Sequence, residues 1–382
     1  MAQTAEARTK QQNAAKDCPA PFFSRETTAA VRGIALVMMF VHHFFTFPEW
    51  WGEGISYPVL AALAPVFRNP LKLCVPVFCF LTGYFYAYRK DHSVRYSLRK
   101  ISDLLLAYGS VFLIFAGTAS FFLHYIYTPR AFFFELFGVS LYFPTMTFGW
   151  YVAFYALSML LLPLVARMPS KHFHIDLLLS LLVFPFLMKL LLHAVGILSL
   201  RAMLQNLMTW FPVTLVGLIT ARYGLFERMD HAVRKIPVWS KKGARIMLLL
   251  LAVLVIPMGR TVADHVTLLF PPLPYIGKSP SIDISLDSVY SPLFLFALSS
   301  LLGEWGSGIP RRVLEGIGKL SPLMWFLSCG FFNNCKTIFQ PLLYAPRNPV
   351  LVTLWGLLLC YAAAFLLDFG LSRLIRLKNR IL

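Results

Sequence analysis

Apolar residues recur along this chain in long stretches, each of which is too long for a strand of a soluble protein. An α-helix needs about 20 mostly apolar residues to cross the hydrocarbon core of a membrane. A window of about that length finds ten predicted spans: 29–47, 71–88, 102–123, 149–165, 175–192, 204–221, 244–258, 289–302, 320–339 and 350–371. We therefore expect an all-α fold, a polytopic membrane helix bundle of about ten transmembrane helices.

The composition also excludes an ordinary soluble domain. Hydrophobic residues make up 58% of the chain and charged residues 14%, whereas about a quarter of the residues of a soluble domain are charged. We expect one membrane domain over 29–371, between a polar N-terminal tail (1–28) and a basic C-terminal tail (372–382). The loop 259–288, rich in Pro and Asp, is predicted to form an irregular surface over the outer mouth of the bundle.

The net charge of +18 follows the predicted topology, so it does not indicate a nucleic-acid partner. If the N-terminus is cytoplasmic, 25 of the 35 Lys and Arg residues fall in the inner loops and the two tails, and seven fall in the outer loops. This asymmetry obeys the positive-inside rule and predicts that both termini are cytoplasmic. The six cysteines form no CxxC pair and no zinc-type spacing with His, so we predict no metal site.

The first predicted span contains ionisable residues, although a helix that only anchors the protein would be surrounded by lipid there. Arg32 and His43 lie eleven residues apart, which puts them on one helix face about 16 Å apart along the axis. His42 points to a different face. Such residues usually face the interior of a bundle and mark a functional site, although Arg32 near a helix end could also snorkel to the headgroups. An imidazole can take and return a proton near neutral pH.

Four sequence blocks resemble those of the acyltransferase 3 family of integral membrane O-acyltransferases. The first is RGIA (32–35), with His43 completing an R-x10-H spacing. The others are VPVFCFLTGY (75–84), GWYV (149–152) with Pro163, and GKLSPLMWF (318–326). The blocks run from the first to the ninth predicted span, so the resemblance covers nearly the whole chain. Two departures are that Ser328 stands where many relatives have a late His, and that Asp103 interrupts a basic pattern at the start of the third span.

The resemblance implies transfer of an acyl group, usually acetyl, from cytoplasmic acyl-CoA to a hydroxyl of an exported saccharide, polysaccharide or cell-wall component. It implies a bacterial cytoplasmic membrane, acetyl-CoA as donor substrate, and a glycan acceptor that can be lipid-linked. A separate extracytoplasmic transferase is a further possible partner. The CoA phosphates need cations, which Arg95, Arg99 and Lys100 would supply. The positive-inside rule accounts for these three residues equally well.

The same resemblance assigns roles to the first helix. Arg32 would orient the arm or thioester of the donor. His43 would act either as general base on the acceptor hydroxyl or as a nucleophile that carries the acyl group, and the sequence leaves both open. His42 would orient or replace His43, or be only a packed polar neighbour.

Four further residues are candidate acceptor contacts: Trp150, Tyr151, Lys72 and Glu49. Each has a simpler interpretation, because aromatic residues anchor span ends, lysines snorkel, and loop carboxylates are solvated. Two other functions compete with the enzyme: a transporter or flippase of polysaccharide intermediates, and a non-catalytic relative of the family. Transporters more often show internal repeats, and we find none in the sequence.

Overall fold

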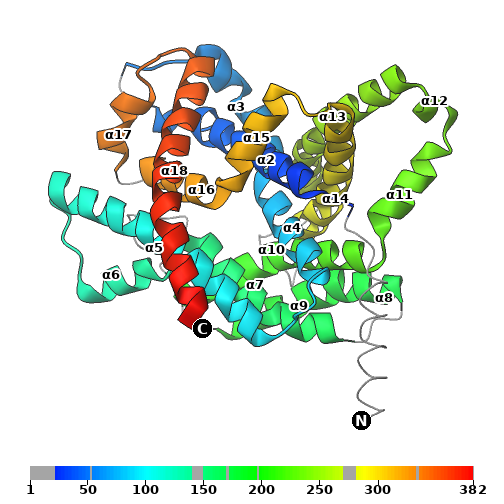
Figure 1. Cartoon of the computed structure of the whole chain (residues 1–382), viewed down its shortest axis with the longest axis horizontal. Helices are drawn as coiled ribbons and strands as arrows, with labels where there is room; N and C mark the ends of the chain where they lie inside the picture. Colours follow the sequence, from blue (N-terminus) through cyan, green and yellow to red (C-terminus); the bar gives the residue numbers. More distant parts are fainter. Residues whose placement is uncertain are drawn as a thin grey trace, which may run out of the picture.

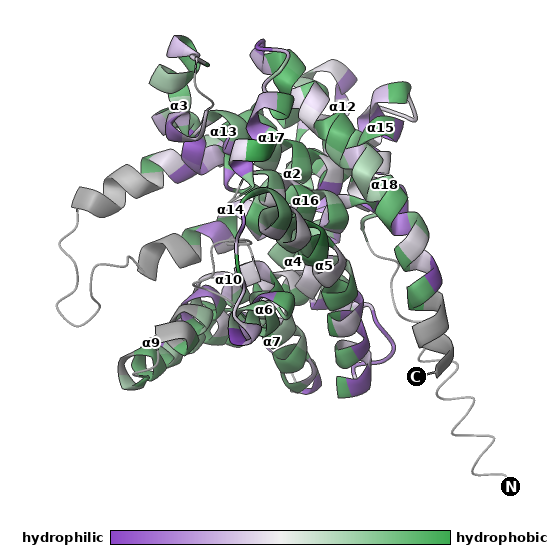
Figure 2. Ribbon diagram, turned by 90° about the vertical axis from the view of Figure 1, so that its left-hand side faces the viewer, coloured by the Kyte–Doolittle hydropathy of each residue, from purple (hydrophilic) through white to green (hydrophobic). Residues whose placement is uncertain are grey.

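The computed structural model describes residues 22–51, 54–139, 149–168, 172–195, 198–269, 281–332 and 335–381. Every element in these ranges is helical, and nine helical segments in them are long and apolar enough to cross a membrane. The chain is therefore a multi-pass membrane protein built as a helical bundle (Figure 1). Hydrophobic residues extend along most of its helices (Figure 2).

The helices follow one another through short connections. In chain order they are α2 (Arg25–Phe45), η1 (Pro48–Trp50), α3 (Pro58–Leu71), α4 (Cys74–Ala87), α5 (Val94–Phe122), α6 (Pro129–Leu136), α7 (Gly149–Arg167), α8 (Phe173–Leu178), η2 (Leu179–Val183), α9 (Phe184–Ala194), α10 (Leu198–Arg222), α11 (Leu225–Arg234), α12 (Pro237–Ser240), α13 (Lys242–Leu269), α14 (Ser281–Glu304), α15 (Ile309–Lys319), α16 (Ser321–Phe332), α17 (Lys336–Leu343) and α18 (Pro349–Ile381).

Nine of the ten predicted spans coincide with one of the nine long segments. The span predicted at 320–339 is not among the nine: it holds the short helices α16 and α17, and residues 333 and 334 between them lie outside the described ranges. With 12 residues, α16 is about 18 Å long, which is shorter than the hydrocarbon core of about 30 Å. Neither helix alone is long enough to cross, and α16 packs against α2, α5 and α18 inside the bundle.

The prediction of an irregular loop over 259–288 is wrong at both ends. Helix α13 continues to Leu269 and α14 begins at Ser281. The charged residues that suggested a loop are accommodated by pairing, since Arg260 Nε lies 2.6 Å from Asp287 Oδ1 across the two helices. Residues 270–280 lie outside the described ranges.

Helix α2 occupies the centre of the bundle (Figure 1), with α3, α4, α14, α15, α16 and α18 packed around it. It begins where the Ser24 hydroxyl accepts a hydrogen bond from the backbone N–H of Thr27, at 3.1 Å. Such a cap satisfies one of the N–H groups that have no partner in the first turn. The polar first turn and the apolar residues that follow explain why the helix starts at this point.

Glycine residues let the backbones of the most extensively packed helix pairs approach each other closely. Helix α2 crosses α15 at Gly33 and Gly318, where a methyl group would collide with the carbonyl oxygens of Leu314 and Ala29. Small residues at membrane helix interfaces let two backbones approach in this way.

Helix α4 crosses α10 by the same device. A methyl group at Gly83 would collide with the carbonyl oxygen of Thr214, and one at Gly217 with that of Phe80. The two crossings fix α2 and α4, and these two helices carry the first two blocks of the sequence resemblance.

Substituting Gly33 or Gly83 by Ala should therefore destabilise the protein, because the added methyl group forces two backbones apart. Overpacking of this kind costs about 1–3 kcal/mol. The measurement is thermal unfolding of the purified protein in detergent. Gly117→Ala and Gly370→Ala are matched controls, since both glycines lie inside helices with open space around them. Equal unfolding temperatures for the crossing variants and the controls would contradict the close contact.

Candidate functional site

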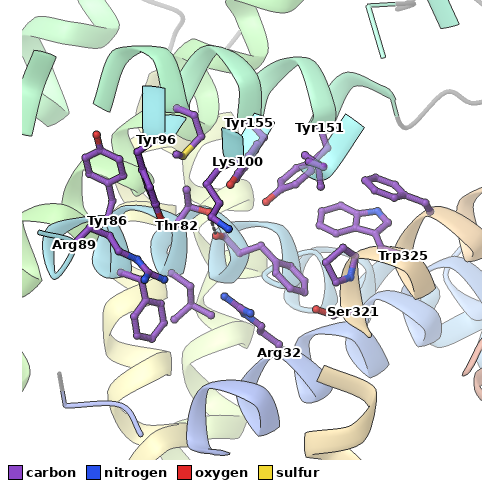
Figure 3. Close-up of a pocket in the computed structure, with 17 residues that line it drawn as sticks. Arg32, Thr82, Tyr86, Arg89, Tyr96, Lys100, Tyr151, Tyr155, Ser321 and Trp325 are labelled. Carbon is purple, nitrogen blue, oxygen red and sulfur yellow. Dashed lines mark hydrogen bonds between the residues drawn. The ribbon is translucent and has the colours of Figure 1, made fainter. Parts of the chain in front are cut away.

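A cavity of about 300 Å³ lies among α2, α4, α5, α7 and α16 (Figure 3). Its polar lining residues come from all five helices and from the turn after α4: Arg32, Thr82, Tyr86, Arg89, Tyr96, Lys100, Tyr151, Tyr155 and Ser321. Its aromatic lining residues include Phe78, Phe85, Trp325 and Phe326. Each of the four sequence blocks contributes at least one of these residues. We call this space the inner cavity.

A second cavity of about 600 Å³ adjoins the first and shares Arg32, Phe85 and Arg89 with it. Five cationic side chains line the two cavities together: Arg25, Arg32, Arg89, Lys100 and Lys319. Within the described part of the chain, neither lining includes a carboxylate. Like charges gathered among apolar walls are unfavourable unless an anion balances them. The site therefore suits a ligand that carries several negative charges.

Arg32 lies where the two cavities meet. It directly precedes Gly33, so the close crossing of α2 with α15 fixes its position along the bundle. Figure 3 shows its guanidinium group pointing into the inner cavity, and the phenols of Tyr151 and Tyr155 lie within electrostatic range of it. Among the described residues, no carboxylate forms an ion pair with Arg32, which keeps this charge available to a ligand.

A capped turn between α4 and α5 positions Arg89 where the inner cavity adjoins the second cavity. We call this end of the site, with Arg25, Arg89 and Lys319, the cationic mouth. The backbone N–H of Ser93 donates to the Asp91 carboxylate at 2.8 Å, and the Ser93 hydroxyl accepts from Tyr96 N–H at 3.1 Å. The Ser93 hydroxyl and N–H hold the pKa of the Asp91 carboxyl below its usual value, so this group stays ionised at neutral pH. The turn brings the Arg89 guanidinium over the Tyr96 ring, 5.9 Å from its centre.

Ser321 adds a hydroxyl at the start of α16. Its side chain is 1% exposed and lines the inner cavity, and its oxygen has no hydrogen-bond partner among the described residues. Figure 3 shows the hydroxyl oxygen on the same side of the cavity as Arg32. A buried hydroxyl normally has a partner, so this group is ready to donate to a ligand.

Of the residues predicted for the donor, the structure brings Arg32 and Lys100 together at the inner cavity, with Lys100 Nζ 3.1 Å from Asp103. Arg95 and Arg99 belong to the same turn of α5 but are exposed and line neither cavity. Arg99 instead lies over the outer side of the Tyr96 ring, 5.8 Å from its centre.

The two histidines lie at the far end of α2, away from Arg32. Both are buried, at 8% and 7% exposure, and neither lines the two cavities. The His43 ring stacks near Trp50 at 6.1 Å, while His42 Nδ1 lies 3.2 Å from the Thr46 hydroxyl. Three cationic side chains from α3, α13 and the turn before α4 lie within electrostatic range of His42, and these are Arg68, Arg260 and Lys72.

The candidate acceptor residues separate into two groups. Tyr151 lines the inner cavity, whereas its neighbour Trp150 turns away and stacks on Trp210 at 6.2 Å. Lys72 and Glu49 are exposed and belong to the end of the bundle that holds the histidines. One predicted set of residues therefore occupies two regions of the molecule, connected by α2.

Six polar lining residues are not candidates from the sequence: Thr82, Tyr86, Arg89, Tyr96, Tyr155 and Ser321. Arg89 was counted only for topology, and Ser321 only as part of a block. Tyr155 follows Tyr151 by one helical turn, so the helical period alone could have found it. Arg89 and Tyr96 face the cavity because of the capped turn, which no periodicity predicts. Among the described residues, no group of three His, Cys, Asp or Glu side chains is arranged to hold a metal ion.

Arg89→Gln should weaken binding of inorganic tripolyphosphate to the detergent-purified protein more than Arg99→Gln does. A hydrogen bond to a charged group contributes about 1.5–3 kcal/mol, so we expect roughly a tenfold loss of affinity or more for Arg89→Gln and little change for Arg99→Gln. Titration calorimetry at two salt concentrations measures both. Equal losses for the two variants would show that general surface charge attracts the anion.

Comparison of the chain with protein-family models, with curated proteins and with solved structures finds no match in any of the three. The resemblance to the acyltransferase 3 family therefore depends on the four sequence blocks. The function has to be argued from the residues of the site.

Proposed function

We propose that this protein is a membrane-bound O-acyltransferase of the acyltransferase 3 type. It would move an acyl group, acetyl in the first instance, from cytoplasmic acyl-CoA to a hydroxyl of an exported saccharide, polysaccharide or cell-wall component. The observation that carries the proposal is that all four sequence blocks line one cavity, through Arg32, Thr82, Tyr151 and Ser321. Residues so far apart in the chain converge on one space because they serve one ligand.

The cationic mouth supports acyl-CoA as the donor. CoA carries several phosphate charges at one end and a thioester at the other, joined by a long flexible arm. Arg25, Arg89 and Lys319 would bind the phosphates, because guanidinium and ammonium groups form charge-assisted hydrogen bonds with phosphate oxygens. Arg32 and the Ser321 hydroxyl, deeper in the site, would then hydrogen-bond to the arm or the thioester carbonyl.

His43 is the proposed reactive group. It lies eleven residues beyond Arg32 on α2, about 16 Å further along the axis, so the arm of CoA would have to extend toward it. As general base, His43 would take the proton of the acceptor hydroxyl, whose oxygen attacks the thioester carbon and displaces the CoA thiolate. As acyl carrier, its imidazole would displace CoA first, and the acceptor hydroxyl would then displace the imidazole.

The proposed topology counts the nine long segments and, as a tenth crossing, α16 and α17 together. Both termini are then in the cytoplasm, and the proposed location is the bacterial cytoplasmic membrane. The distribution of Lys and Arg supports this orientation. The cationic mouth would then open to the cytoplasm, where acyl-CoA is made, and the end with the histidines would face outward, toward the exported acceptor. A separate extracytoplasmic transferase could receive the acyl group there.

His43→Ala should abolish ester-linked acylation of the surface glycans without lowering the amount of protein in the membrane. General acid–base catalysis contributes about 10²–10⁴-fold to a rate, so the residual acylation should be that of a deletion strain. The measurement is chemical analysis of the glycan esters in a deletion strain complemented with each variant. His231→Ala, at an exposed position of α11, is the matched control and should restore acylation fully.

Unchanged acylation in the deletion strain, with reduced glycan export, would replace the enzyme by a transporter of polysaccharide intermediates. Full acylation by His43→Ala would leave the enzyme standing but remove His43 from its mechanism.

A cysteine introduced between residues 270 and 280 should react with a membrane-impermeant thiol reagent added to intact cells. The five native cysteines of the described chain are buried, and Cys18 would be replaced by Ser in the background. Lys241→Cys, at the exposed turn before α13, is predicted to face the cytoplasm and should react only after the cells are opened. The reverse pattern would overturn the proposed orientation.

A further inference from the structure

Three aromatic rings from three helices meet at the end of the inner cavity opposite its cationic mouth. Trp325 of α16 is 4% exposed, and its ring centre lies 4.3 Å from that of Tyr151 on α7 and 5.1 Å from that of Phe78 on α4. All three residues line the cavity. Figure 3 shows Trp325 and Tyr151 at one end and Arg89 and Tyr86 at the other. We call these three rings the aromatic constriction.

Along α4, the aromatic constriction lies between the level of Arg32 and that of His42. Phe85 of α4 lines the cavity together with Arg32. Phe78 precedes Phe85 by seven residues on the same helix, which puts it about 10 Å closer to the start of α4. Lys72, just before α4, lies within electrostatic range of His42. Helix α4 therefore passes the Arg32 level at Phe85, the aromatic constriction at Phe78, and the histidine level at its beginning.

The backbone that carries Trp325 is held on several sides. The Ser328 hydroxyl donates to the Trp325 carbonyl oxygen at 2.7 Å. The next residue, Phe326, packs edge-on against Tyr108 of α5, with ring centres 5.3 Å apart. Helix α16 is enclosed by α2, α5 and α18. Protein interiors are close-packed, so the indole can give way only a little to an intruding group.

The lining of the cavity favours one orientation of a bound ligand. Its anionic end belongs with Arg89, Arg32 and the second cavity, where the cations are. Its other end therefore points toward Trp325, where the lining is aromatic. On the proposed function, that end is the acyl group.

We propose that Trp325, packed between Tyr151 and Phe78, sets the upper size of the acyl group that the protein accepts. The inference assumes the proposed acyltransferase function and makes Trp325 a specificity-determining residue. A short acyl group fits past or against the three rings. A longer chain meets the indole, because each added methylene must displace a close-packed ring.

The test measures the binding of acetyl-CoA, butanoyl-CoA and octanoyl-CoA to the full-length protein in detergent, by titration calorimetry. Wild type should bind acetyl-CoA more tightly than octanoyl-CoA. Trp325→Ala should raise the octanoyl-to-acetyl affinity ratio by roughly tenfold or more, since one methylene in an apolar pocket already changes discrimination by about that factor. Trp325→Phe should give an intermediate ratio.

Trp210→Ala is the matched control. Trp210 is also buried, at 6% exposure, but it lines neither cavity. Its loss should cost stability without changing the octanoyl-to-acetyl ratio. If Trp325→Ala cannot be purified, Trp325→Phe decides the question by the same ratio.

An unchanged ratio in the Trp325 variants, with acetyl-CoA bound by wild type, would overturn the role of Trp325 and leave the proposed function intact. A wild type that binds none of the three thioesters would overturn the proposed function itself. An equal rise of the ratio in Trp210→Ala would show that any loss of packing relaxes the selectivity, and it would also overturn the inference.

Discussion

Close packing of helix backbones at glycine residues determines where every other part of the site can lie. At the crossing of α2 with α15 the carbonyl oxygens of one helix occupy the space that a side chain of the other would need, and the same holds for α4 with α10. In a bilayer no hydrophobic effect drives helices together, so close van der Waals contact between backbones has to hold them. Arg32 directly precedes Gly33 of the first crossing, and Thr82 directly precedes Gly83 of the second.

In the resulting geometry, the cationic side chains of the site lie apart from carboxylates. Five cations line the two connected cavities, while the ion pairs of the described chain are formed elsewhere or, at Lys100 and Asp103, at the edge. Charges in a low-dielectric interior interact strongly, and a bundle that keeps Arg32 without a carboxylate is less stable than one that neutralises it. Such an arrangement is useful when an anionic ligand supplies the missing charge. The unpaired Arg32 charge then lowers the stability of the empty protein and raises its affinity for an anion.

Helix α2 connects two chemically different regions. At one end, Arg32 is accompanied by tyrosines, a serine hydroxyl and further cations. At the other, His42 and His43 are surrounded by aromatic rings and by Arg68, whose guanidinium group donates to the Thr46 carbonyl oxygen at 3.0 Å. The aromatic constriction lies between them. On the proposed function, these rings are where the acyl group would be selected by size.

The amino-acid sequence alone is enough to predict a membrane helix bundle, the positions of nine long helical segments, and Arg32, Lys100 and Tyr151 as candidate site residues. These features follow from local properties: the length of apolar runs, the 3.6-residue period, and the cost of a charge in lipid. The family resemblance, too, is a pattern along the chain. The packing of the helices, by contrast, brings Arg89, Tyr155 and Ser321 into one cavity with Arg32, keeps Arg95 and Arg99 out of it, and leaves α16 too short to cross alone. Which face of a helix meets a cavity depends on how its neighbours pack against it, and the glycine crossings that set this packing join residues more than a hundred positions apart.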